Sequence, residues 1–143
     1  MKEIKGDITE VKSGVLIQQV NCMGAMGAGV ALAILKKWPR VREEYIMFCS
    51  GHSPEKLFGQ LYKTELETGL TLFNSFTQFN YGGDVKHTDE EKLIANIKSV
   101  AQFYPEREVY IPKLIGCGLA GGDWPTVYEG IKDIDNLTIV EFN

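Results

Sequence analysis

The feature that most constrains the fold is an apolar run that leads through a glycine-rich segment into a stretch of helix-forming residues. Residues 15–20 (VLIQQV) form a short run rich in aliphatic and β-branched side chains, as is typical of a buried strand. Glycine and alanine dominate residues 24–29, and residues 30–37 (VALAILKK) favour a helix that ends before Pro39. A strand, a glycine loop and a helix in this order predict a layered α/β unit.

The rest of the chain continues this alternation of strands and helices. We expect a helix from Pro39 to near Gly51, followed by strands at 58–66 and 70–78 that are joined as a hairpin. A capping box of Thr88 and Glu91 then opens another helix. The last expected elements are a strand at 108–112, a glycine-rich loop at 114–122, a helix at 124–134 and a strand at 138–142. This order predicts an α/β fold of three layers, with a mixed central sheet and helices on both faces. The length of 143 residues suits a single domain over residues 1–143.

Composition excludes several classes of partner and cellular environment. A formal net charge of -4 argues against broad nucleic-acid binding, which requires a basic face. The three cysteines are odd in number and far apart, which favours a reducing cytoplasm over a disulfide framework. Neither a CxxC nor an HxxxH pattern occurs, so no metal site is expected. The first residues lack the apolar run of a signal peptide, and no apolar stretch reaches the ~18 residues of a membrane span.

Two glycine loops carry the main chemical signal. Small residues follow the apolar run at 21–30 and recur at 115–122 after a later strand. Backbone N–H groups can approach phosphate oxygens in such loops, and a helix N-terminus adds partial positive charge. One loop alone could equally be a tight turn, but two loops favour a ligand of diphosphate size. Neither loop has the Gly-Lys-Ser/Thr ending of a P-loop, which disfavours nucleotide hydrolysis with magnesium.

Asp7 lies at the end of the first expected strand. Its carboxylate could accept a hydrogen bond from the amino group of an adenine. An aspartate in this position could equally cap a turn, so both interpretations stay open on composition alone.

Together these segments resemble a macrodomain. The likeness rests on residues 5–9 (KGDIT), on the strand that ends at Asn21 with the loop and helix after it, and on residues 111–119 (IPKLIGCGL). It covers nearly the whole chain in the right order. Residues 21–49 resemble most closely the branch that holds the yeast-type ADP-ribose-1''-phosphate phosphatases and the terminal ADP-ribose glycohydrolases.

The resemblance implies a set of ADP-ribose contacts. Asp7 and Ile8 would bind the adenine, and Asn21 would hydrogen-bond the distal ribose. The diphosphate would lie between two groups of residues: Gly27, Ala28, Gly29 and Val30 on one side, and Ile115, Gly116, Cys117, Gly118, Leu119 and Ala120 on the other.

The catalytic residues of related glycohydrolases are not matched. Those enzymes resemble one another in a lysine from the mid-chain strand and an aspartate in the second loop, whereas this chain has residues 74–78 (NSFTQ) and Ala120 there. The candidates that remain are Asn21, Asp123 and His87. Asp123 precedes a helix and could equally be an N-cap, and His87 could equally be a surface residue.

The expected activity is therefore hydrolysis at the terminal ribose of an ADP-ribose derivative, of the ADP-ribose-1''-phosphate phosphatase type, in the cytoplasm and without a cofactor. Two alternatives stay open, so enzymatic activity is itself uncertain: a non-catalytic protein that binds free or protein-linked ADP-ribose, and a glycohydrolase with a non-standard catalytic set. The expected partners are ADP-ribose or a derivative and, in the second case, an ADP-ribosylated protein. A nucleotide-binding oxidoreductase would need an acid at a strand end about 20 residues after the glycines, where this chain is expected to be helical.

Overall fold

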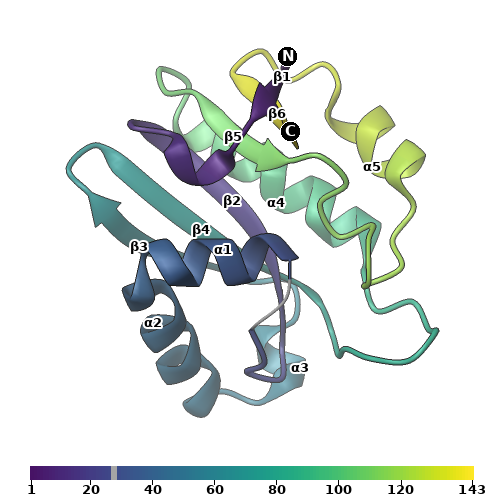
Figure 1. The fold of residues 1–143 in the computed structure, drawn as a ribbon. Coiled ribbons are helices and arrows are strands. Elements are labelled where there is room, and N and C mark those ends of the chain that lie inside the picture. The colour runs from purple at the N-terminus through teal and green to yellow at the C-terminus, as the bar shows by residue number, and fades with distance from the viewer. Residues whose placement is uncertain (27–28) are drawn as a thin grey trace.

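A computed structural model describes residues 1–26 and 29–143 of the chain. A single sheet forms its centre (Figure 1), with the strands in the order β1-β6-β5-β2-β4-β3. Their bounds are β1 Lys2–Gly6, β2 Gly14–Asn21, β3 Leu61–Glu67, β4 Leu70–Gln78, β5 Val109–Pro112 and β6 Leu137–Phe142. Neighbouring strands run parallel except for β3, which pairs antiparallel with β4 in the expected hairpin. The predicted mixed sheet is confirmed.

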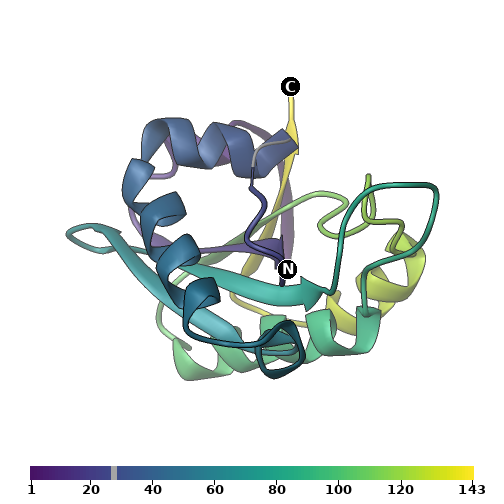
Figure 2. The ribbon, with the colours of Figure 1, turned by 90° about the horizontal axis from the view of Figure 1, so that it is seen from below.

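Helices cover both faces of this sheet, as Figure 2 shows from below. Their bounds are α1 Gly29–Lys37, α2 Pro39–Ser50, α3 Pro54–Leu57, α4 Glu90–Phe103 and α5 Trp124–Ile131, and a 3₁₀ turn, η1, covers Ile8–Glu10. α1 and α2 pack on one face, and α4 and α5 pack on the other. Among the described residues, no helix is both long and apolar enough to cross a bilayer.

The central strand β2 shows why the sheet needs both helical layers. Val15 and Ile17 pack into the core beneath α4 and α5, while Leu16 and Val20 pack into the cores beneath α1, α2 and α3. Successive side chains of a strand point to opposite faces, so an almost continuous apolar run indicates a strand that is covered on both sides.

Three expected boundaries were wrong. Helix α4 is capped by Asp89, whose Oδ1 accepts the Lys92 N–H at 3.0 Å, and not by Thr88. The expected strand at 58–66 begins only at Leu61, because α3 and the left-handed Gly59 precede it. Helix α5 ends at Ile131, where the Ile134 N–H closes a turn on the Ile131 carbonyl. A serine before a proline, Ser53-Pro54, was the overlooked helix-start signal of α3.

Candidate ligand-binding site

The parallel strands bring the predicted ligand residues to one edge of the sheet. Because β1, β6, β5, β2 and β4 all run in the same direction, their carboxyl ends lie together. The residues that follow these ends are Asp7 after β1, the first glycine loop after β2, the 79–88 segment after β4 and the second glycine loop after β5. In open α/β sheets this is the edge at which ligands bind.

Asn21 organises the first glycine loop from the last position of β2. Its Oδ1 accepts the N–H groups of Met23 at 3.0 Å and Ala25 at 3.3 Å, and its Nδ2 donates to the Ala25 carbonyl at 2.6 Å. The Tyr45 hydroxyl lies 2.9 Å from the same Oδ1. Asn21 is buried, so most of its hydrogen-bonding capacity is spent on holding the loop.

Helix α1 starts at the end of this loop with Gly29, whose φ of 58° is left-handed. The first N–H groups of an α-helix have no intrahelical acceptor, and Gly29 and Val30 are both exposed. These donors are therefore open to an anion at this edge. Gly27 and Ala28, predicted to contact the diphosphate from the same side, lie outside the described residues.

The second glycine loop is anchored at its ends and open in its middle. The Gly122 N–H donates to the Gly116 carbonyl at 3.0 Å, and the Cys117 N–H donates to Leu114 at 2.8 Å. The consecutive N–H groups of 118–120 have no hydrogen-bond acceptor among the described residues. Ile115 and Ala120 are buried, whereas Gly118 and Leu119 are exposed. The loop thus presents backbone donors on a fixed frame, which is what an anion site requires.

Asp7 is both a cap and a free acceptor. Its Oδ1 accepts from the Thr9 hydroxyl at 2.7 Å and the Thr9 N–H at 2.9 Å, and these bonds keep the pKa of the carboxyl below its usual value. Its Oδ2 has no donor among the described residues. The Ile8 side chain is buried in the core, but its backbone N–H has no acceptor in the described part of the chain. An acceptor beside a donor matches the edge of an adenine.

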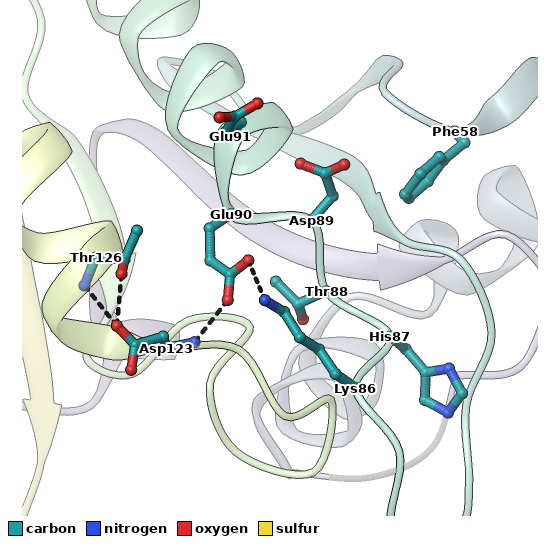
Figure 3. A pocket seen from close by; sticks show the side chains of 9 residues that line it. All are labelled: Phe58, Lys86, His87, Thr88, Asp89, Glu90, Glu91, Asp123 and Thr126. Atoms are coloured by element: carbon teal, nitrogen blue, oxygen red, sulfur yellow. Dashed lines mark hydrogen bonds and ion pairs between the residues drawn. The ribbon is translucent and has the colours of Figure 1, made fainter.

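The three catalytic candidates occupy different surroundings. His87 and Asp123 line one hollow beside the 79–88 segment, and Asn21 is not among its lining residues. Figure 3 shows the ring of His87 pointing away from the other polar groups, and its Nε2 lies 2.8 Å from the Gly82 carbonyl oxygen. Asp123 caps α5: its Oδ2 accepts from the Thr126 hydroxyl at 2.5 Å and the Thr126 N–H at 3.0 Å, which lowers the pKa of the Asp123 carboxyl.

An ion pair in the same hollow was not anticipated. Lys86 Nζ lies 2.6 Å from Glu90 Oε1, and the Asp123 N–H donates to Glu90 Oε2 at 2.8 Å (Figure 3). The hydrogen bond to Glu90 raises the pKa of Lys86. Lys86 precedes the helix that begins at Glu90, so the i,i+4 rule for a helix face gave no sequence signal for this pair. This lysine belongs to the 79–88 segment and not to β4, so it does not replace the strand lysine of the related glycohydrolases.

The cysteine in the second loop is not an activated nucleophile. Burial, together with the nearby charges of Glu90 and Asp123, raises the pKa of the Cys117 thiol to about 11. The group is therefore protonated at neutral pH, as expected for a small packed side chain.

Comparison with known proteins finds relatives of the whole chain, although no protein-family model matches it. The chain is 26% identical to the ADP-ribose 1''-phosphate phosphatase of Candida albicans, across 94% of this chain and 93% of that protein. It is 24% identical to a DNA ADP-ribosyl glycohydrolase of Thermus aquaticus over 93% of its length, and it spans 37% of that longer protein.

Solved structures resemble the whole fold. A protein of unknown function from Bacteroides thetaiotaomicron superposes with a TM-score of 0.85 at 28% identity, over 99% of this chain and 97% of that one. The macrodomain of Mycobacterium tuberculosis DarG superposes with a TM-score of 0.77 at 20% identity, over 99% of this chain and 98% of that one. The Thermosipho africanus DarTG structure in complex with ADP-ribose superposes with a TM-score of 0.68 at 17% identity, over 92% of this chain and 38% of that one.

The fold is therefore that of a macrodomain, as predicted. In sequence, the chain is similar over nearly its whole length to an ADP-ribose 1''-phosphate phosphatase.

Proposed function

We propose that this macrodomain binds ADP-ribose, or a derivative of it, across the carboxyl edge of its sheet. The observation that carries the proposal is the run of N–H groups at 118–120, which have no acceptor among the described residues and lie at the same edge of the sheet as the first turn of α1. Together these donors suit a diphosphate, which distributes its charge over several oxygens. Asp7 Oδ2 and the Ile8 N–H supply a matching acceptor and donor for the adenine.

The reaction proposed at this site is hydrolysis of the phosphate ester at the terminal ribose. The full-length similarity to a phosphatase named for ADP-ribose 1''-phosphate favours this substrate. The missing strand lysine argues against the glycohydrolase alternative: β4 offers Asn74 and Gln78, and neither amide is a nucleophile at neutral pH. Donors in the loops would stabilise charge that develops on the phosphate.

The surroundings of the three candidates favour different roles for them in the proposed reaction. Asn21 shapes the first loop, so its contribution is positional. Asp123 carries a carboxylate whose Oδ1 remains free among the described residues, which makes it the better candidate for orienting a water. His87 is oriented by the Gly82 carbonyl and lines the same hollow.

Calorimetry with ADP-ribose, ADP and AMP tests the binding proposal. We expect ADP-ribose to bind most tightly, and an absence of heat with ADP-ribose would overturn it. Incubation with ADP-ribose-1''-phosphate, followed by phosphate detection, tests the reaction. Phosphate release by the wild type that is lost in Asp123→Asn would support the phosphatase. ADP-ribose binding without any phosphate release would instead favour the non-catalytic alternative.

A further inference from the structure

A chain of hydrogen bonds runs beneath the second glycine loop, from α4 to the loop itself. Asn96 Nδ2 lies 3.0 Å from Ser75 Oγ, and Ser75 Oγ lies 3.1 Å from Thr77 Oγ1. Thr77 Oγ1 donates to Gln19 Oε1 at 2.8 Å. Gln19 Nε2 then donates to Thr88 Oγ1 at 2.9 Å.

The chain ends on a loop carbonyl, and this fixes the direction of every bond in it. Thr88 Oγ1 lies 2.6 Å from the Gly116 carbonyl oxygen, which can only accept. The Thr88 hydroxyl must therefore donate to Gly116 and accept from the Gln19 amide. Because the Gln19 Nε2 group donates to Thr88, the Gln19 Oε1 atom lies toward Thr77 and accepts the Thr77 hydroxyl proton. Thr77 in turn accepts from the Ser75 hydroxyl.

Most members of the chain are shielded from water, and Gln19 is half-buried. Ser75 and Thr77 are fully buried, Thr88 is 5% exposed and Asn96 is 8% exposed. Hydrogen bonds that point the same way in a low-dielectric interior polarise and strengthen one another. The hydrogen bond from the Thr88 hydroxyl to the Gly116 carbonyl is therefore stronger than it would be if Thr88 had no other hydrogen-bond partner.

Thr88 touches the loop at both ends of its open segment. Its hydroxyl holds the Gly116 carbonyl, while its backbone N–H donates to the Ala120 carbonyl at 3.3 Å. The N–H groups of 118–120, without an acceptor in the part of the chain that the structure describes, lie between these contacts. Close packing enforces the same arrangement: a Cβ on Gly116 would lie 2.8 Å from Gln19 Oε1, and one on Gly122 would lie 3.0 Å from Thr88 Cγ2.

We propose that Thr88 is a positioning residue for anion binding: with Gln19 behind it, its hydroxyl holds residues 116–120 in the conformation that presents their N–H groups to a phosphate. The role rests on the proposed ADP-ribose site, but it concerns a side chain that does not touch the ligand. A donor array that is already in place costs less ordering entropy when the ligand binds.

The test compares Thr88→Val, which keeps the side-chain shape and removes the hydroxyl, with Thr88→Ser, which keeps the hydroxyl. We expect Thr88→Val to weaken ADP-ribose binding about tenfold in calorimetry and Thr88→Ser to bind nearly as the wild type does. Thr71→Val is the matched control, because Thr71 is also buried and donates its hydroxyl to Glu65 at 2.9 Å. It should change thermal stability without changing the ADP-ribose affinity.

Amide exchange measured by NMR on the unliganded protein provides a second readout. Thr88→Val should speed the exchange of the hydrogen-bonded amides of Cys117, Gly121 and Gly122, which hold the frame of the loop. Gln19→Met, which removes the donor behind Thr88, should do so to a smaller extent. Wild-type affinity and wild-type exchange in a folded Thr88→Val protein would overturn the proposal, and so would a Thr88→Ser variant as weak as Thr88→Val. If the wild type binds no ADP-ribose, the proposed function fails, whereas the exchange data still decide whether Thr88 orders the loop.

Discussion

The Tyr45 hydroxyl lies beneath the first glycine loop, 2.6 Å from the backbone oxygen of Asn21 and 2.9 Å from its Oδ1. Tyr45 is fully buried, and burial raises the pKa of its phenol well above the usual value. The phenol is therefore a permanent donor, and it links helix α2 to the residue that shapes the loop.

Removing this donor should loosen the loop. Tyr45→Phe leaves the ring in place but deletes the hydroxyl, so we expect the free energy of unfolding to fall by about 1–2 kcal/mol, together with a weaker affinity for ADP-ribose. Denaturant titration and calorimetry measure the two effects. Tyr62→Phe is the control: Tyr62 packs against Phe48 in the same region, and its hydroxyl has no partner among the described residues. An equal loss in both variants would contradict a special role for the Tyr45 hydroxyl.

The free oxygen of Asp7 predicts a change of base preference. Asp7→Asn can keep an acceptor for Thr9 but places an amide N–H where Oδ2 stands. ADP-ribose should then bind about 10- to 100-fold more weakly, because an adenine amino group would meet a donor. The hypoxanthine analogue, which offers a carbonyl at that position, should lose much less. Parallel calorimetric titrations with both ligands measure this, and equal losses would place the base elsewhere.

Charge introduced at Gly118 should block a diphosphate. Gly118 is exposed, its φ is not left-handed and an added Cβ meets nothing within 4 Å, so substitution there leaves the fold intact. We expect Gly118→Glu to bind ADP-ribose at least about 100-fold more weakly through repulsion of like charges. Gly118→Ala serves as the control and should bind nearly normally. Wild-type affinity in Gly118→Glu would mean that the loop does not hold the phosphates.

Glu90 predicts a pH-dependent contribution to stability. Burial disfavours its charge, but the hydrogen bonds from Lys86 and the Asp123 N–H outweigh burial and lower the pKa below the ordinary 4.5. A carboxyl with a depressed folded-state pKa stabilises the fold above the unfolded-state pKa and loses this contribution as the pH falls through the folded-state value. Glu90→Gln should therefore be less stable than the wild type at pH 7, and this gap should close below about pH 4. The exposed neighbour Glu91 provides the control Glu91→Gln, and denaturant titrations across this range would reveal a constant gap if the idea is wrong.

The sheet interior holds a polar pair whose loss should not harm the fold. Gln18 Nε2 donates to Asn74 Oδ1 at 2.8 Å, but Gln18 Oε1 and Asn74 Nδ2 are buried without a partner among the described residues. Replacing both side chains by leucine should be neutral or stabilising, whereas either single replacement should cost about 1–3 kcal/mol by stranding the other amide. A double-mutant cycle in denaturant checks this. A double variant that is less stable than both single variants would show that the pair is needed.

Local pattern was enough to predict much of the fold. The run at 15–20, the glycines after it and the helix formers at 30–37 each favour one local structure, and the sheet combines them as expected. The start of α4 was wrong for a tertiary reason: Thr88 and Asp89 are both good N-caps, and Thr88 is occupied by the Gly116 carbonyl.

The ligand site could be predicted only in part. Asp7 and the glycines carry a recognisable local pattern. Gln19, in contrast, is one of two adjacent glutamines in an otherwise apolar run, and its partners Thr77 and Thr88 are 58 and 69 residues away in the sequence. No local signal joins such residues, because their contact exists only once β2 and β4 have paired.

The Ala120 carbonyl accepts from the N–H groups of both His87 and Thr88, so the second glycine loop is coupled to the base of the 79–88 segment and not to its tip. Residues 81–85 are exposed, and insertions there would leave both bonds to Ala120 intact. A single extra residue between Lys86 and Asp89 would instead shift the His87 and Thr88 N–H groups relative to the Ala120 carbonyl. Changes of length among related sequences are therefore expected at the tip of the 79–88 segment, while its base stays constant in length.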